Sequence, residues 1–284
     1  MADYAFRLVN VFAEAPLAGN PLAVFEDARG LDDATMQALA LQFNLSETTF
    51  ILPSAQGSAR VRIFTPTFEM PFAGHPTLGS AHVVRALGRA GAEVTLEMKA
   101  GLIPVSAIGD EWTLEAKPPR TRRVAAPRAT LGEMLGLNGE AIAAEPLWVD
   151  TGSEQLVIPL SSADAVRNCA PDAALLARHG SVEMPGGGQR SMAYVWAYEQ
   201  PGSVRARFFF PKHGAIVEDP GTGSACANLG GWLVATHAPR PLSMIVLQGE
   251  AVGRPCRLGL AVDAAGRIFV SGRVIELGRG IVSL

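Results

Sequence analysis

The feature that most constrains the fold of this sequence is an internal repeat. Residues 62–66 (RIFTP) are followed eight positions later by the turn GHPT at 74–77 and then by an apolar run. The same order recurs 145 positions further on, where residues 207–211 (RFFFP) precede the turn DPGT at 219–222 and a second apolar run. Because several motifs recur in one shared order, the sequence predicts a duplicated domain.

A fainter similarity supports the same idea. Residues 46–53 and 153–159 are both apolar strand candidates that end at a proline. The length of 284 residues is also long for a single core, and 48% of the residues are hydrophobic while only 18% are charged. We therefore expect two domains, residues 1–117 and 118–267. Residues 118–127 form the expected linker, and the last strand, 268–284, is expected to return to the first domain.

Alternating apolar and polar residues predict strands at 59–64 and 204–208. The apolar run after each glycine-containing turn has few charges, which predicts a helix buried nearly all round. Helices between strands are too few for an alternating parallel sheet, so the expected class is α+β, with a mostly antiparallel sheet around a central helix in each domain. Further strands are expected at 94–98, 112–115, 245–248, 257–262 and 267–270.

Charge and cysteine usage exclude several classes of function. The 24 Lys and Arg residues against 27 Asp and Glu residues give a net charge of −3, which offers no attraction to nucleic acid or an anionic membrane surface. No apolar stretch approaches the roughly 18 residues of a membrane span. The three cysteines are scattered and odd in number, which argues against a disulfide framework and favours the reducing cytoplasm.

The two turns that precede the buried helices are the strongest local signals of a site. The first amides of a helix and its dipole favour an anion, so the two ends are candidates for binding one anionic ligand. The structural alternative makes Asp219 a helix N-cap with Pro220 in the first turn. Nucleotide-loop, serine-hydrolase and metal-ligand spacings are missing from the sequence, so we expect neither metal nor cofactor.

Two titratable residues are candidates for proton transfer. Glu47 stands where an apolar strand begins, and partial burial would make its carboxylate a better base for a proton on carbon. A surface glutamate in a turn is the alternative. His75 lies between Gly74 and Pro76, where an acid/base role and a simple turn hydrogen bond are both open.

The whole chain resembles the phenazine-biosynthesis isomerase (PhzF-like) family, which shares the diaminopimelate epimerase-like fold. The resemblance implies two similar domains with an active site in the cleft between them, and usually a homodimer. By the same resemblance, Glu47 matches the catalytic acid/base that moves a proton between carbons of a cyclic dienyl carboxylic acid. The matching stretches, in family order, are residues 19–24, 44–50, 62–66, 72–79, 218–225, 248–249 and 253–255.

The other roles implied by the resemblance follow the motifs. His75 and Asp219 match polar partners that orient the substrate and assist the transfer. Gly74, Gly223 and Ser224 would contact the ligand through backbone N–H groups or a hydroxyl. The expected function is a cofactor-independent isomerase of a small carboxylic acid.

Two alternatives remain open at the level of sequence. The related epimerases use paired cysteines, but the corresponding positions fall near Ala73 and Pro220, neither of which accepts a proton, and Cys226 is expected in the core. A mixed-base epimerase would need His75 as a second proton carrier. A protein that binds a small acid without catalysis needs none. The roles of Arg190, Arg254 and Cys256 are not assigned.

Overall fold

The computed structural model describes residues 1–183, 187–212 and 214–284. The chain divides into two compact units. Unit 1 comprises Met1–Glu115 and Ser271–Leu284, and unit 2 comprises Ala116–Val270. Both units consist mainly of antiparallel strands with one long buried helix each, so the predicted α+β class is confirmed. The predicted domain limits at 117 and 268 stay a prediction.

Unit 1 is a closed ring of strands. Its order is β19–β1–β2–β3–β4–β6–β7–β8, and β8 pairs with β19 to close the ring. The elements are β1 (Asp3–Val11), β2 (Asn20–Phe25), α1 (Asp33–Phe43), β3 (Thr48–Leu52), β4 (Ala59–Phe64), β5 (Glu69–Met70), α2 (Gly74–Ala86), β6 (Glu93–Met98), β7 (Gly101–Ile108), β8 (Glu111–Glu115) and β19 (Ile268–Ser283).

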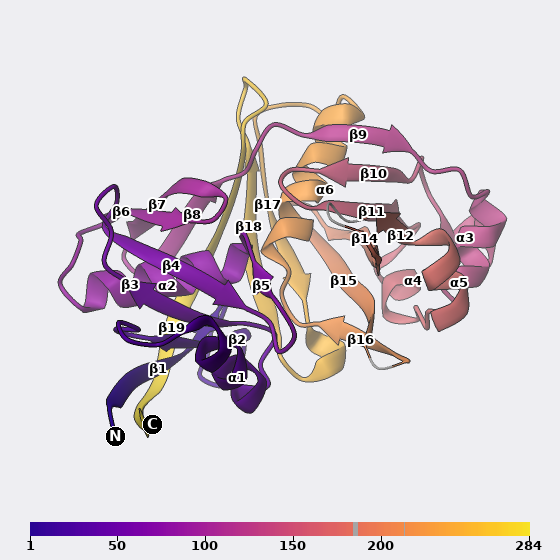
Figure 1. The fold of residues 1–284 in the computed structure, drawn as a ribbon. Coiled ribbons are helices and arrows are strands. Elements are labelled where there is room, and N and C mark those ends of the chain that lie inside the picture. The colour runs from indigo at the N-terminus through magenta and orange to yellow at the C-terminus, as the bar shows by residue number, and fades with distance from the viewer. Residues whose placement is uncertain (184–186, 213) are drawn as a thin grey trace. The chain divides into compact units, whose positions relative to one another are not determined.

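Helix α2 is surrounded by this ring (Figure 1). It contacts β1, β2, β3, β4, β6, β7 and β8, and ten of its 13 residues are buried. Gly79 allows the closest approach, because a Cβ at that position would lie 2.6 Å from Leu22 Cδ2 and 3.1 Å from Val11 Cγ2. The predicted helix buried nearly all round is confirmed here.

Unit 2 repeats this plan with a longer insertion. Its helix α6 is also buried over ten of 13 residues and contacts β9, β10, β11 and β18. The elements are β9 (Arg120–Arg123), α3 (Arg128–Met134), η1 (Gly139–Ala141), β10 (Leu147–Asp150), β11 (Glu154–Pro159), α4 (Ala163–Arg167), α5 (Ala173–His179), β12 (Ser181–Glu183), β13 (Gln189–Ser191), β14 (Ala193–Gln200), β15 (Ser203–Lys212), β16 (Ala215–Asp219), α6 (Gly223–Ala235), β17 (Leu242–Gln248), η2 (Glu250–Val252) and β18 (Cys256–Val262).

The two units share one topology. The series β1–β2–β3–β4–β6–β7 and the series β10–β11–β14–β15–β17–β18 are both joined antiparallel, parallel, antiparallel, parallel and antiparallel. In this order β11 corresponds to β2, and β14 corresponds to β3. The fainter repeat between 46–53 and 153–159, which equated β3 with β11, is therefore wrong.

The repeat also shifts at the turn before each helix. Arg207 lies 145 positions after Arg62, and each donates through Nε to a carboxylate, Glu218 at 3.0 Å and Glu69 at 2.7 Å. Glu218 lies 149 positions after Glu69, because the β15–β16 hairpin is four residues longer than the β4–β5 hairpin. Residue 213, in that hairpin, lies outside the described residues.

This shift corrects the equivalence of the two turns. Helices α2 and α6 begin at Gly74 and Gly223, so these two residues correspond, and His75 corresponds to Ser224. The sequence had instead equated the turn 74–77 with the turn 219–222. The four extra residues of the hairpin cannot be recognised in the sequence, because turn residues make few contacts with the core and follow no fixed pattern.

The predicted linker is also wrong. Within residues 118–127, Arg120–Arg123 form the exposed strand β9, which pairs antiparallel with β10. The Arg122 guanidinium lies 4.5 Å from the centre of the Trp148 ring and donates to Glu154 at 2.6 Å. Prolines on both sides of a basic run indicate a loop in the sequence, but pairing with β10 decides the local structure.

Candidate functional site

Glu47 is placed by the end of one helix and the start of one strand. Helix α1 ends at Phe43, its C-cap Asn44 takes the left-handed conformation with φ 51°, and β3 begins one residue after Glu47. Strand β3 lies between β2 and β4 within unit 1. The Glu47 side chain is only 15% exposed. The carboxylate therefore stands mostly buried at the start of a buried strand, so the alternative of a surface glutamate in an open turn is wrong.

His75 lies in the first turn of α2, where no side chain caps the helix. Its Nε2 is 3.5 Å from Glu47 Oε2, and its Nδ1 is 3.4 Å from Asn20 Nδ2. Burial lowers the pKa of the imidazole to about 3, against a smaller opposing contribution from the Pro21 carbonyl. His75 is consequently neutral at physiological pH, and its contact with Glu47 is not an ion pair.

A neutral imidazole has one ring N–H and one acceptor nitrogen. The Nδ1 atom faces Asn20 Nδ2 and the Nε2 atom faces the Glu47 carboxylate, so in the tautomer with its hydrogen on Nε2 the imidazole N–H points at Glu47. The Nε2 to Oε2 distance of 3.5 Å exceeds the usual hydrogen-bond range of about 2.6 to 3.2 Å.

Asp219 lies at the end of β16, in the turn that precedes α6. The Thr222 hydroxyl donates a hydrogen bond to its carboxylate. The N-cap of α6 is Thr222, so the alternative in which Asp219 caps the helix is wrong. The buried Gln248 fastens this turn, since its Nε2 donates to the Asp219 carbonyl at 2.9 Å and to Thr222 Oγ1 at 3.0 Å.

Gly223 and Ser224 form the first turn of α6, whose first N–H groups have no partner within the helix. The Ser224 hydroxyl accepts a hydrogen bond from Gln155 Nε2 at 2.9 Å. Gln155 and Asn228 are buried polar residues that connect this hydroxyl to β10 and β11. Unit 2 thus brings Asp219, Gly223 and Ser224 into one turn, while unit 1 brings Glu47, Gly74 and His75 together.

The repeat shows that this chemistry is not duplicated. Thr48 pairs with Phe64 in unit 1, and Ala193 pairs with Phe209 in unit 2, so Met192 is the counterpart of Glu47. Met192 is buried and carries no ionisable group. Ser224 stands where unit 1 has His75. The carboxylate and imidazole therefore occur together in one unit only.

Sequence reasoning missed four supporting residues: Asn20, Gln155, Asn228 and Gln248. Asn20 and Gln248 stand inside stretches that carry the family resemblance, which was the available signal for them. Gln155 and Asn228 lie 73 positions apart and touch only in the folded chain. Buried amides of this kind have no short-range pattern, because their partners come from distant elements.

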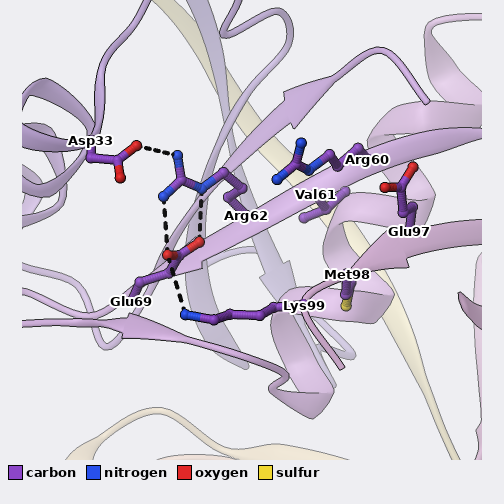
Figure 2. A pocket seen from close by; sticks show the side chains of 8 residues that line it. All are labelled: Asp33, Arg60, Val61, Arg62, Glu69, Glu97, Met98 and Lys99. Atoms are coloured by element: carbon purple, nitrogen blue, oxygen red, sulfur yellow. Dashed lines mark hydrogen bonds and ion pairs between the residues drawn. The ribbon is translucent and has the colours of Figure 1, made fainter. Parts of the chain in front are cut away.

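Two surface grooves occupy equivalent positions in the repeat and contain none of the predicted site residues. The unit 2 groove of about 240 Å³ lies beside Arg205 and Arg207 of β15, and the unit 1 groove of about 450 Å³ lies beside Arg60 and Arg62 of β4. In Figure 2 the Arg62 guanidinium lies between Asp33 and Glu69. The eight residues that line the unit 1 groove are Asp33, Arg60, Val61, Arg62, Glu69, Glu97, Met98 and Lys99.

The remaining candidates, Arg190, Cys226 and Cys256, all belong to unit 2. Arg190 donates to Ser153 Oγ at 2.7 Å and to the Glu154 carbonyl at 3.2 Å. Cys226 and Cys256 are buried, and burial raises the pKa of both thiols, so neither is a ready base. Among residues 1–183, 187–212 and 214–284, no group of three or more His, Cys, Asp and Glu side chains could hold a metal ion.

Residues 9–278 match the family described as phenazine biosynthesis-like protein, PhzC–PhzF. The chain belongs to this family. A relative from Pasteurella multocida, named an uncharacterized isomerase, is 41% identical over 99% of this chain and 94% of its own length. The trans-2,3-dihydro-3-hydroxyanthranilate isomerase of Pseudomonas aeruginosa is 34% identical and covers 98% of both chains. The crystal structure of a Bacillus anthracis PhzF-family protein covers 100% of both chains with a TM-score of 0.86 at 22% identity.

Membership of the PhzC–PhzF family confirms the resemblance and the enzyme class expected from the sequence, an isomerase. The Bacillus anthracis structure confirms the fold through its similarity over the whole chain. No helix in the described part of the chain is long and apolar enough to cross a membrane.

Proposed function

We propose that this PhzC–PhzF protein moves a proton between two carbons of a small, cyclic, unsaturated carboxylic acid, without a cofactor. The observation that carries the proposal is the Glu47 carboxylate, mostly buried and 3.5 Å from a buried, neutral His75. A carboxylate removed from bulk water is a stronger base toward a proton on carbon than an exposed one. The name of the Pseudomonas aeruginosa relative supports this class of substrate.

In the proposed reaction, the Glu47 carboxylate takes a proton from one ring carbon of the substrate. The electron pair left behind spreads over the conjugated system, and the new carboxylic acid returns the same proton to another carbon. Neutral His75 donates a hydrogen bond through Nε2 and holds the carboxyl group in place. The amides of Gly74 and Gly223 and the Ser224 hydroxyl bind the substrate, and Asp219 assists in orienting it.

A single proton carrier distinguishes this reaction from epimerisation by two opposed bases. The register of the repeat makes Thr222 the counterpart of Ala73 at the N-terminus of each buried helix. The motifs in the sequence placed Pro220 opposite Ala73 instead, but none of Ala73, Pro220 and Thr222 is a base. Met192, the counterpart of Glu47, cannot supply a second carboxylate.

The test is proton NMR in deuterated water with trans-2,3-dihydro-3-hydroxyanthranilate and a panel of small cyclic unsaturated acids. We expect the wild type to incorporate deuterium at carbon, and Glu47→Gln to be slower by about 10²- to 10⁴-fold, the usual contribution of general acid/base catalysis. Glu93→Gln, which changes an exposed glutamate of β6, is the matched control and should retain the wild-type rate.

The outcomes separate the candidates. An undiminished rate in Glu47→Gln would contradict the proposed proton carrier. Loss of optical activity at equilibrium with an optically active acid would indicate an epimerase. Binding of an acid without exchange of any carbon-bound hydrogen would indicate a binding protein.

We also propose that the protein is a cytoplasmic homodimer. The family resemblance supports the dimer, and three free, buried cysteines are compatible with a reducing compartment. Light scattering should then give twice the chain mass of 29.9 kDa.

A further inference from the structure

A chain of buried amides in unit 2 fixes the direction of every hydrogen bond that leads to Ser224. Asn228 is fully buried, and its side chain makes four hydrogen bonds. Its Oδ1 accepts from the Thr151 backbone N–H at 2.9 Å and from the Thr151 hydroxyl at 2.7 Å. Its Nδ2 donates to the Ser153 carbonyl at 2.8 Å and to Gln155 Oε1 at 2.8 Å. All the hydrogen-bonding capacity of this amide is used.

Two backbone groups set the orientation of Asn228. A backbone N–H can only donate, so the atom facing Thr151 N must be the amide oxygen. A backbone carbonyl can only accept, so the atom facing Ser153 O must be the amide nitrogen. The same nitrogen donates to Gln155, which obliges Gln155 to present its oxygen to Asn228 and its nitrogen to Ser224.

The Ser224 hydroxyl is therefore an acceptor on its inner side. Gln155 Nε2 donates to it at 2.9 Å, and in the described ranges of the chain its own hydrogen has no acceptor. Gln155 is 3% exposed, whereas Ser224 is partly exposed. The hydroxyl hydrogen must then be directed toward whatever occupies the outer side of Ser224. The first N–H groups of α6 are donors as well, so Ser224 and the amides beside it offer donors, while the Asp219 carboxylate in the preceding turn accepts from the Thr222 hydroxyl.

We propose that Gln155 and Asn228 are positioning residues that hold Ser224 as a hydrogen-bond donor, and that this makes the α6 end select a carboxylate. A carboxylate accepts at both oxygens and is charged, whereas a primary carboxamide has one accepting oxygen, and its NH₂ group cannot accept from a donor. The inference rests on the proposed function only in assigning the substrate carboxylate to Ser224. Unit 1 has no equivalent chain of amides, because His75 and Gly79 stand at the positions of Ser224 and Asn228.

The test reverses the direction of the hydrogen bond between residue 155 and Ser224. In Gln155→Glu, a carboxylate faces Ser224 and accepts its hydrogen, so Ser224 can only accept from the ligand. Binding is measured by calorimetry in the Glu47→Gln background, which keeps turnover out of the measurement. The probes are 2-amino-3-hydroxybenzoic acid, a stable aromatic analogue of the substrate named for the Pseudomonas aeruginosa relative, and its primary amide.

We expect Gln155→Glu to weaken binding of the acid by about 10- to 100-fold, the range for a hydrogen bond to a charged group. The amide should lose much less affinity, so the preference for acid over amide falls. The new negative charge would also repel the acid, and Ser224→Ala separates this effect. When Ser224→Ala is already present, adding Gln155→Glu should weaken binding of the acid only by the amount that the added negative charge causes. In a protein that retains Glu47, Gln155→Glu should raise KM for the acid substrate far more than it lowers kcat.

Gln189→Glu, at the exposed first residue of β13, is the control for added charge, and thermal unfolding checks that each variant folds. If Gln155→Glu is too unstable, Gln155→Met, which removes the donor without adding charge, should reduce the preference for the acid in the same direction. Equal losses for acid and amide, or equal effects of Gln155→Glu with and without the Ser224 hydroxyl, would overturn the inference. A wild type that binds neither probe would also overturn it. The proposed function is tested separately, by comparing deuterium incorporation in the wild type and in Glu47→Gln.

Discussion

At the scale of the residue, His75 is a titratable side chain kept away from water. It is 5% exposed at the start of a helix enclosed by the ring of unit 1, and burial lowers its pKa to about 3. A protonated imidazole at this position would lose its hydration without a full ion pair to replace it. The neutral form, which has a single N–H group, is therefore the one compatible with the fold.

The depressed pKa predicts how stability depends on pH. Between about pH 6.5, the pKa of an unfolded histidine, and pH 3, the unfolded chain binds a proton at His75 that the folded chain does not. The contribution of His75 is thus fully present above pH 6.5 and is lost as the pH falls. The slope approaches about 1.4 kcal/mol per pH unit, or about 2 kcal/mol between pH 6.5 and 5.

Urea unfolding of wild type, His75→Gln and His75→Asn between pH 7.5 and 5 measures this contribution. Relative to wild type, both variants should lose less stability on acidification, because neither replacement binds a proton. Curves for wild type and variants that stay parallel over this range would show that His75 titrates alike in the folded and unfolded chains.

At the scale of the element, the two buried helices depend on glycines that face the sheet. In α6, a Cβ at Gly231 would lie 2.7 Å from Val149 Cγ1 and 2.9 Å from Pro119 Cβ. These neighbours belong to a β-branched residue and a proline ring, which have little freedom to move. The methyl group would also lie 3.3 Å from Cγ2 of Thr151, which donates to Asn228 in the chain of buried amides that leads to Ser224.

We predict that Gly231→Ala destabilises the protein by about 1 to 3 kcal/mol, the usual cost of overpacking a core. The cost should exceed the gain of up to about 1 kcal/mol in helix propensity. Chemical denaturation measures the change. Gly91→Ala is the matched control, since a Cβ there meets nothing within 4 Å. A Gly231→Ala protein as stable as the control would mean that α6 can shift within its sheet without cost.

Helix α6 also shows what could and could not be predicted from the sequence. Its apolar run and the strands around it follow from hydrophobic patterning, and Glu47 and His75 follow from the family resemblance. The start of α6 at Gly223, three residues beyond Pro220, depends on Gln248, which binds residues 219–222 from another strand. The strand β9 likewise depends on β10 and the Trp148 ring. Such contacts between distant segments leave no local pattern.

At the scale of the whole molecule, a duplicated topology carries chemistry that differs between its halves. Unit 1 holds the carboxylate and imidazole, while unit 2 holds donors that suit an anion. The cysteines are also divided unevenly, because Cys169, Cys226 and Cys256 all belong to unit 2 and all are buried. Their reactivity therefore reports on the unfolding of that unit alone.

Native protein should resist alkylation by iodoacetamide at pH 8. Burial raises the pKa of Cys169 from 9.0 to about 12, which lowers its reactive thiolate fraction about 1,000-fold, and burial raises the pKa of the other two thiols as well. In guanidinium chloride, mass spectrometry should count three adducts. Near the midpoint of unfolding, short labelling should give molecules with none or three, because the thiols lie in one compact unit. A population labelled at Cys169 alone would instead show that the segment after α4 opens before the rest of unit 2.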